Sequence, residues 1–233
     1  MPLPQTNGLV PAVFLDRDGT LIEDNGSLRR PTEVVFFAAT IPALRRLQER
    51  FRLFIVTNQS AVAKGEVTLD EANQVNAHVV ERLCEQGVQI RAVYCCPHQR
   101  ADNCACIKPK PFFLEHAARE HGLDLRRSFV IGDHPHDVEL ARNVGATGVY
   151  VLTGHGLKHR AELRGDEVVT ADVAATADWI LTADGSTGRE SFVGKGAPRP
   201  MEARMRTKGA RNRIKVSERS DTIQQDEKES LKT

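Results

Sequence analysis

The sequence predicts an α/β protein with a doubly wound parallel sheet. From about residue 10 to residue 183, short apolar segments alternate with segments of helical periodicity, as strands alternate with crossover helices. Three of the apolar segments end in polar side chains, and open α/β sheets bind ligands beyond the carboxyl ends of their strands. The chain has 233 residues, 40% of them hydrophobic, which suits one such domain with residues to spare.

The amino-acid composition limits the classes of function and partner that we expect for this protein. The formal net charge of +1 gives no case for nucleic acid or a membrane surface as partner, and no apolar stretch approaches the ~20 residues of a membrane span. Residues 1–11 do not resemble a signal peptide. Four of the five cysteines lie between residues 95 and 106, which indicates a metal in a reducing compartment rather than a disulfide framework. We therefore expect a cytoplasmic protein.

The first predicted strand is the uninterrupted apolar segment 12–15. Asp16 and Asp18 follow it, and their side chains would project the same way from an extended chain before Gly19 allows a sharp turn. Two carboxylates this close resist joint ionisation unless a cation lies between them, and Mg²⁺ prefers oxygen ligands. We expect a magnesium site here; the alternative is an Asp-rich turn without a ligand.

A polar loop, two helices and two strands come next. Residues 21–35 predict a loop over the strand end, and residues 42–50 a helix that begins at Pro42. The second strand, 51–56, ends in hydroxyl and amide side chains suited to hold a phosphoryl oxygen: Thr57, Asn58, Gln59 and Ser60. Residues 68–86 predict a helix with a capping box, and residues 88–94 the third strand.

Three cysteines and a histidine cluster directly after this strand. Cys96 and His98 form one pair, and Cys104 and Cys106 form a second pair five residues later. Three thiolates and one imidazole are a complete tetrahedral set for Zn²⁺ with no position left open for a substrate. We therefore expect a structural zinc site in the loop 95–107, which has little apolar content to fold without a metal. Cys95 in place of Cys96, or free core cysteines, are the alternatives.

A lysine and a third acidic strand end complete the polar pattern. Lys108 follows the loop directly and is suited to neutralise phosphate charge and the two acids. Asp133 follows the fourth strand and is suited to complete a metal site with Asp16. The remaining predicted elements are helices at 111–120 and 138–143, strands at 129–131, 149–152 and 167–169, and a last helix around residues 179–181.

The composition changes near residue 184. Residues 185–233 hold 12 Lys and Arg against 7 Asp and Glu, with few apolar residues and no periodicity. We interpret 184–233 as a disordered basic tail, and the mixed charges favour a solvated tail over a nucleic-acid-binding one.

In this order the motifs resemble those of the haloacid dehalogenase-like (HAD) phosphohydrolases. They are Asp-x-Asp-Gly-Thr from Asp16, Thr57 at the second strand end, Lys108 before a proline, and Asp133 followed four residues later by Asp137. The Cys-Pro-His and Cys-x-Cys pairs resemble those of the heptose bisphosphate phosphatases and the histidinol-phosphatases within that superfamily. The resemblance implies a HAD-like fold without a large cap domain.

The resemblance also implies an aspartyl-phosphate mechanism. Asp16 would be the nucleophile and Asp18 the general acid and base, while Thr57 and Lys108 would hold the transferring phosphoryl group. Mg²⁺ would be bound by Asp16, the backbone carbonyl of Asp18, and Asp133. Asp137 would orient these ligands. The substrate would be faced by Asp24, Asn25, Gly26, Ser27, Asn58, Gln59 and Ser60.

Two positions depart from the branch that the chain resembles. Ile107 stands where an arginine precedes the Lys-Pro pair, and His134 stands where a lysine often follows the aspartate. Both lie where a second phosphate or the sugar would be contacted. The expected activity is a phosphomonoesterase for a small phosphorylated sugar, most similar to a heptose 1,7-bisphosphate 7-phosphatase, with histidinol-phosphatase as the alternative. A non-catalytic zinc-stabilised binding protein and a phosphatase for nucleic-acid ends are weaker alternatives, and we expect a monomer.

Overall fold

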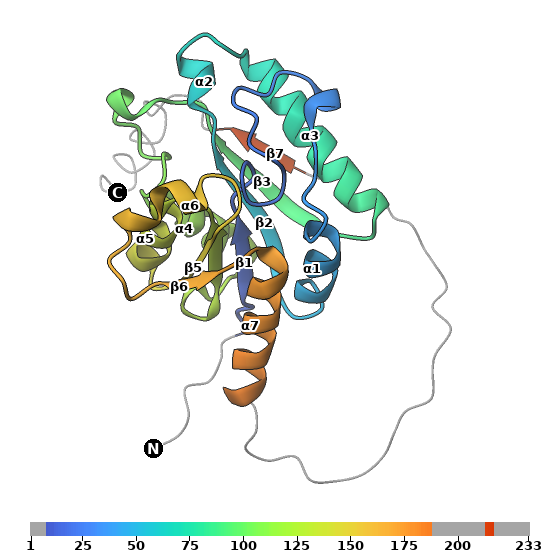
Figure 1. The fold of residues 1–233 in the computed structure, drawn as a ribbon, viewed down its shortest axis with the longest axis vertical. Coiled ribbons are helices and arrows are strands. Elements are labelled where there is room, and N and C mark those ends of the chain that lie inside the picture. Colours follow the sequence, from blue (N-terminus) through green and yellow to red (C-terminus); the bar gives the residue numbers. More distant parts are fainter. Residues whose placement is uncertain (1–7, 188–212, 217–233) are drawn as a thin grey trace, which may run out of the picture.

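A parallel sheet forms the centre of the protein (Figure 1). The computed structural model describes residues 8–187 and 213–216. The strands, all parallel to their neighbours, are β1 (Ala12–Leu15), β2 (Arg52–Asn58), β3 (Ile90–Cys96), β4 (Phe129–Gly132), β5 (Thr147–Val151), β6 (Val168–Thr170) and β7 (Arg213–Val216). Their order is β6-β5-β4-β1-β2-β3-β7. Because β1 lies between β2 and β4, the polar residues that follow these strands meet at one edge of the sheet.

Helices cover both faces of the sheet. They are α1 (Thr40–Leu47), α2 (Ser60–Ala63), α3 (Leu69–Glu85), α4 (Phe112–His121), α5 (Pro135–Val144), α6 (Gly156–His159) and α7 (Val173–Thr187). Val13 and Leu15 of β1 pack in one hydrophobic cluster with α1, α3 and α7, and Ala12 and Phe14 pack in the other with α4 and α5. Successive strand side chains point to opposite faces, so an uninterrupted apolar strand can serve both clusters. The predicted doubly wound α/β fold is thereby confirmed.

The six predicted strands and the longer predicted helices are present, with shifted ends. β2 and β3 begin and end later than predicted, so Thr57, Asn58, Cys95 and Cys96 are themselves strand residues. The side chains of these strand ends take part in polar contacts, such as those of Thr57 with Gln59 and of Asn58 with the Lys108 amide, which an apolar pattern does not reveal.

Two helices begin earlier than predicted. α1 begins at Thr40 rather than at Pro42, and the Thr40 hydroxyl donates to the Leu21 carbonyl over 2.7 Å. α5 begins at Pro135, because the His134 ring accepts from the His136 amide and Asp137 accepts from the His134 amide. Side-chain capping by His134 and Asp137 therefore explains the earlier start of α5, whereas no side chain caps the start of α1.

Most of the predicted tail, 184–233, lies outside the described residues, but two parts of it are described. Residues 184–187 continue α7, and Arg213–Val216 forms β7 at the edge of the sheet, next to β3. Lys215 of β7 forms an ion pair with Glu120 of α4. The prediction of a structureless tail is thus not met at these residues, since pairing with an edge strand needs little apolar periodicity.

None of the helices in the described ranges is long and apolar enough to cross a lipid bilayer.

Candidate active site

Three strand ends bring the candidate residues together. Asp16 follows β1 and its amide donates to the Ile131 carbonyl of β4, which ties the first residue after β1 to the neighbouring strand. Asp133 follows β4, and Asp137 lies in the first turn of α5. Ligand oxygens of Asp16, Asp133 and Asp137 lie within 4.8 Å of one another. These side chains are almost completely buried, so the group concentrates negative charge in a site of low dielectric.

Lys108 supplies the one ammonium in contact with this acidic group among the described residues. Its Nζ lies 2.6 Å from Asp16 Oδ1 and 2.7 Å from Asp137 Oδ1, and its side chain is only 6% exposed. The Lys108 amide donates to Asn58 Oδ1 over 3.1 Å, which fixes its backbone against the end of β2. Lys108 therefore reaches the end of β1 from a loop that is anchored at β2.

The pKa values of the site residues reflect an excess of carboxylates over positively charged side chains. Burial raises the pKa of Asp16 well above its usual range, and Lys108 offsets this rise only in part, while Asp137 and Asp133 add to it. Burial and Asp137 raise the pKa of Asp133 to about 6, although the His155 amide donates to it over 2.7 Å. Lys108 has a raised pKa because Asp137 and Asp16 outweigh its burial. Three buried carboxylates facing one ammonium form a site that a divalent cation would stabilise.

Asp18 is not a member of this acidic group, but its charge adds to the rise in the pKa of Asp16, and both residues line the same cleft. The close carboxylate pair expected at the end of β1 stays a prediction. The Arg17 side chain contacts Asp18 through Nε at 3.0 Å and through a terminal nitrogen at 2.9 Å. Gln59 Nε2 donates to Asp18 Oδ2 over 2.7 Å. Two partners therefore fix the Asp18 carboxylate.

Those partners are themselves anchored. Arg17 is 1% exposed and donates to Asn76 Oδ1 of α3 over 2.6 Å. Gln59 Nε2 also donates to Thr57 Oγ1 over 2.8 Å, and Thr57 is buried beneath the cleft. A continuous set of hydrogen bonds thus runs from α3 through Asp18 to the end of β2.

Glycine is required where the turn after β1 approaches Asp133. Gly19 has φ +78°, and a Cβ there would lie 2.0 Å from Asp133 Oδ2. A Cβ at Gly132 would lie 2.1 Å from Asp137 Cγ. Any larger residue at either position would therefore displace an acid of the site.

The predicted substrate loop lies at the entrance of the site. The Gly26 amide donates to Asp24 Oδ1 over 3.0 Å, and the His155 ring lies 3.3 Å from Asp24 Oδ2. Ser27 donates to Glu66 Oε2 over 2.7 Å, which ties the loop to the segment after α2. Asn25 is exposed and does not line the cleft, because the Asp24 turn places its second residue away from the site.

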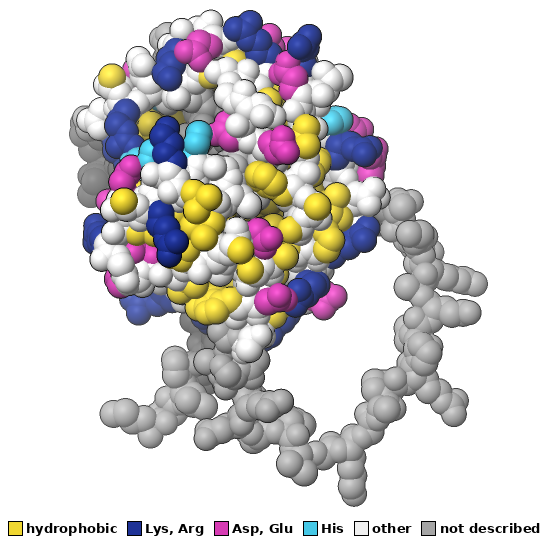
Figure 2. All heavy atoms as spheres, in the orientation of Figure 1, with side chains coloured by type: hydrophobic (Ala, Val, Ile, Leu, Met, Phe, Trp, Pro, Cys, Tyr) yellow, Lys and Arg dark blue, Asp and Glu magenta, His cyan; other side chains and the backbone are white. Residues whose placement is uncertain are grey.

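A cleft of about 490 Å³ opens over these groups, a volume suited to a small metabolite. The predicted site residues that line it are Asp16, Asp18, Asp24, Gly26, Ser27, Asn58, Gln59, Ser60, Lys108 and Asp133. Figure 2 shows histidine side chains next to Lys or Arg side chains at the edge of a hollow on this side of the molecule.

Some lining residues had no assigned role in the sequence analysis: Lys64, Glu66, Arg100, Asp137 as a member of the acidic group, and His155. Arg100 contacts the His136 ring, which stacks on His134 with ring centroids 4.3 Å apart. Burial, His134 and Arg100 lower the pKa of His136 to about 4, so its ring is neutral and can accept from Arg100. No sequence motif identifies these residues. Only Lys64 and Glu66 could have been suspected from the sequence, because they lie shortly after the polar residues Thr57–Ser60 at the predicted end of the second strand.

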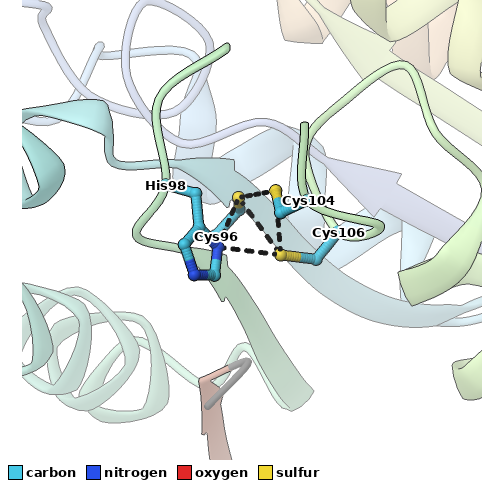
Figure 3. A group of neighbouring side chains, drawn as sticks. All are labelled: Cys96, His98, Cys104 and Cys106. Atoms are coloured by element: carbon cyan, nitrogen blue, oxygen red, sulfur yellow. Dashed lines mark hydrogen bonds between the residues drawn. The ribbon is translucent and has the colours of Figure 1, made fainter. Parts of the chain in front are cut away.

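The predicted cysteine and histidine ligands converge beside this cleft (Figure 3). The Sγ atoms of Cys96, Cys104 and Cys106 lie 3.3–3.6 Å apart, and His98 Nδ1 lies 3.3 Å from Cys106 Sγ and 3.7 Å from Cys96 Sγ. Tetrahedral zinc with Zn–S bonds of ~2.3 Å would place sulfurs about 3.8 Å apart, close to this arrangement. The group is therefore consistent with a zinc site, and it contains Cys96 rather than Cys95.

The thiols of this cluster resist ionisation as they stand. A hydrogen bond from Cys106 and burial raise the pKa of Cys96, and burial together with Cys106 raises that of Cys104. A bound cation would reverse this preference, since thiolates are the form that ligates metals.

Sequence comparison shows relatives over most of the domain. A family model described as HAD-hydrolase-like matches residues 105–176. The D-glycero-beta-D-manno-heptose-1,7-bisphosphate 7-phosphatase of Yersinia pestis is 36% identical over 182 residues, which are 74% of this chain and 90% of that protein. The D-glycero-D-manno-heptose-1,7-bisphosphate 7-phosphatase of Thermosynechococcus vestitus is 31% identical over 74% of this chain and 96% of its own.

The fold of a solved relative agrees. The D,D-heptose 1,7-bisphosphate phosphatase from B. bronchiseptica, complexed with magnesium and phosphate, superposes with a TM-score of 0.69 at 30% identity. The match covers 75% of this chain and 99% of that one. Identity at this level along nearly the full length of these relatives shows that the chain belongs to the HAD-like hydrolases and is a phosphatase of that family.

Proposed function

We propose that this protein is a Mg²⁺-dependent phosphomonoesterase that removes the 7-phosphate of D-glycero-D-manno-heptose 1,7-bisphosphate through an aspartyl-phosphate. The observation that carries the proposal is the contact of Lys108 with Asp16 at the end of β1, with Asp133 in the same acidic group. The names of the relatives support this choice of sugar phosphate.

Each half of the reaction has a nucleophile and a proton carrier. An Asp16 carboxylate oxygen attacks phosphorus, the new O–P bond forms as the ester P–O bond breaks, and Asp18 gives its proton to the leaving alkoxide. Asp18 then takes a proton from a water whose oxygen attacks the same phosphorus. The Asp16–P bond breaks, inorganic phosphate leaves and both carboxyls return to their first state. Thr57 and Lys108 hold the phosphoryl oxygens throughout.

The acidic group fits a magnesium ion. Asp16 and Asp133, with the Asp18 backbone carbonyl, would be its ligands, and Asp137 would orient them through Lys108 and the α5 amides. Bound there, the ion would neutralise the excess negative charge of the carboxylates and of the phosphate. All of the donors are oxygens, as this hard cation prefers.

The cysteine cluster fits a zinc ion that stabilises the structure. Cys96, His98, Cys104 and Cys106 would fill four positions, which leaves none for substrate. Its role would be to hold the loop that carries Lys108, only two residues after Cys106, against the end of β2.

The sugar would lie over the remaining lining residues. Asn58, Gln59 and Ser60 would face it from the end of β2, and Asp24, Gly26 and Ser27 from the opposite loop. Hydroxyl-rich ligands suit such amide and carboxylate partners.

Histidinol phosphate is the second candidate substrate. Asp24 and Glu66 line the cleft, and either carboxylate could pair with the ammonium group of that compound. A sugar bisphosphate has no ammonium group and carries a second phosphate instead. Histidinol phosphate would therefore need a negatively charged partner in the cleft, and a sugar bisphosphate a positively charged one.

Phosphate release distinguishes these candidates. Purified protein loaded with Zn²⁺ and Mg²⁺ would be assayed on heptose 1,7-bisphosphate, histidinol phosphate and a panel of sugar monophosphates, beside Asp16→Asn. We expect the highest kcat/KM with heptose 1,7-bisphosphate and loss of turnover in the variant. Higher kcat/KM with histidinol phosphate would replace the substrate, and turnover that survives in Asp16→Asn would refute the nucleophile.

A further inference from the structure

Two cations of the cleft, Arg100 and Lys64, have no acidic partner among the described residues. Arg100 lines the same cleft as Asp16 and Lys108, but its guanidinium contacts a histidine ring, His136, instead of a carboxylate. Lys108 is different, because Asp16 and Asp137 both neutralise it. The positive charge of Arg100 is therefore available to a ligand, and a guanidinium keeps that charge at any ordinary pH.

The Arg100 side chain is held in position. His136 lies in the first turn of α5, where its amide donates to His134 Nδ1 over 3.3 Å and its ring stacks on that of His134. The His134 ring also packs at 4.6 Å from that of His159 in α6, so the histidines form a continuous wall. The Arg100 side chain is exposed, and its guanidinium contacts this histidine surface through the His136 ring.

The backbone of Arg100 is fixed as well. It begins a short 3₁₀ turn, Arg100–Asp102, between the two halves of the cysteine cluster. The Asn103 amide donates to the Arg100 carbonyl over 3.2 Å, and Lys110 donates to the carbonyls of Asn103 and Cys104. The loop that would be closed by zinc therefore presents Arg100 to the cleft.

The other residues of the cleft near Arg100 are less suited to bind an anion. Ile107, on the same loop, offers only apolar surface. Lys64 also lines the cleft, just after the short helix α2, and like Arg100 it is exposed. Of the two, Arg100 is the one whose side chain contacts another described residue of the cleft, His136.

We infer that Arg100, backed by the His136 ring, binds a second phosphate of the substrate, the one that is not removed. A guanidinium offers paired N–H donors that match two phosphate oxygens, and a charge-assisted pair of this kind discriminates strongly against a ligand that lacks the phosphate. This inference rests on the proposed phosphatase function and assigns the substrate class to sugar bisphosphates. It also predicts discrimination against histidinol phosphate, whose ammonium would face Arg100.

Kinetics with matched substrates tests the assignment. The full-length, metal-loaded protein and Arg100→Ala would be assayed on heptose 1,7-bisphosphate and on heptose 7-phosphate, which lacks the second phosphate. We expect Arg100→Ala to raise KM for the bisphosphate at least ~10-fold, as for loss of one charged hydrogen-bonded pair, with a small change in kcat. With heptose 7-phosphate both constants should stay within about twofold, since no group reaches Arg100.

Variants separate this role from loss of charge or of fold. Arg100→Lys keeps the charge without the paired donors and should recover part of the affinity. Arg119→Ala removes an exposed cation of α4 outside the cleft and should change neither substrate. Zinc content and the thermal midpoint report whether the loop stays folded. If Arg100→Ala does not fold, the comparison is made with Arg100→Lys and Arg100→Gln.

Binding to a blocked enzyme gives an independent readout. In Asp16→Asn with Mg²⁺, calorimetry should show heptose 1,7-bisphosphate bound at least ~10-fold more tightly than heptose 7-phosphate, and adding Arg100→Ala should remove that difference. Equal effects of Arg100→Ala on both ligands, or none on either, would overturn the inference. Failure of the wild-type protein to hydrolyse either ester would instead refute the proposed function, so the two failures are distinct.

Discussion

Lys108 Nζ lies 2.6 Å from Asp16 Oδ1, although 92 positions separate the two residues in the chain. The contact closes the site from a loop that leaves β3, across the end of β2, to the end of β1. Both side chains are almost completely buried, so neither charge is stable without the other.

Replacing Lys108 by methionine should therefore disable the site. The variant leaves Asp16, Asp133 and Asp137 without their ammonium, and we expect kcat to fall at least ~100-fold, as for loss of one oxyanion donor. Without metal, stability should fall by about 3 kcal/mol, as for a broken buried ion pair, and Mg²⁺ should restore part of it. Urea denaturation with and without Mg²⁺ measures this, with the exposed Lys158→Met as control. A kcat within threefold of wild type would contradict the assignment.

Gly19→Ala should displace Asp133. Its Cβ would lie 2.0 Å from Asp133 Oδ2, in addition to the strain of a φ of +78°. Gly87→Ala is the matched control, since Gly87 has φ +76° and nothing within 4 Å of an added Cβ. Both variants should lose about 1–2 kcal/mol from backbone strain, but only Gly19→Ala should weaken Mg²⁺ activation of the phosphatase. Equal Mg²⁺ titration curves for the two variants would show that Asp133 can move aside harmlessly.

Cys104→Ser should remove a ligand of the cysteine cluster. We expect loss of close to one Zn²⁺ per chain by elemental analysis, a lower thermal midpoint, and a lower kcat because the loop carries Lys108. Cys84→Ser is the control, because Cys84 is exposed on α3 and outside the cluster. Zinc content that is unchanged in Cys104→Ser would exclude Cys104 as a ligand.

Arg17→Met should impair Asp18 as a proton donor. Arg17 and Gln59 both contact the Asp18 carboxylate, and Asn76 anchors Arg17. An alkyl phosphate needs a proton on its leaving oxygen and p-nitrophenyl phosphate does not, so kcat/KM should fall at least ~10-fold more for the alkyl ester. Asn76→Ala should show the same bias, but weaker. Equal losses for the two esters would indicate that Arg17 has only a structural role.

Glu167 should give the protein an acid-sensitive ion pair. Burial tends to raise its pKa, but Arg142 and the amides of Arg164 and Gly165 outweigh this and lower the pKa of Glu167 to about 2. A carboxyl whose folded pKa is depressed stabilises the protein fully above its unfolded pKa, near 4.5, and loses that contribution as pH falls toward 2.

The free energy of unfolding of wild type should therefore decrease between pH 4.5 and 2 more steeply than that of Glu167→Gln. Urea denaturation at a series of pH values measures the two slopes. The exposed Glu81→Gln makes the same change of charge on α3 and should follow wild type. Parallel curves for wild type and Glu167→Gln would show that the ion pair does not contribute.

Local patterns predicted the strands and most of the helices. The segment 12–15 reads as a buried strand without reference to the rest of the chain, and Thr68 with Glu71 marks the start of α3, as the observed capping box confirms. The four residues of the cysteine cluster were also recognisable, because their ligand types and spacing lie within one short loop.

Contacts between distant segments were not predictable in the same way. The place of Asp137 within the acidic group and the contact of Arg17 with Asp18 depend on the tertiary structure. The place of Arg100 beside His136 depends on how the loop folds against α5, 36 residues later in the chain. β7 is similar, since its four residues become a strand only by pairing with β3.

The sequence by itself thus determined the α/β alternation, the polar strand ends and the two candidate metal sets, because each depends on neighbouring residues and on general rules for parallel sheets. Only the tertiary structure decided which acids meet Lys108, that Arg100 contacts a histidine ring in the cleft, and which side chains hold Asp18. These outcomes depend on distances of a few ångströms between segments far apart in the chain, and burial at those distances sets the energy of each charge.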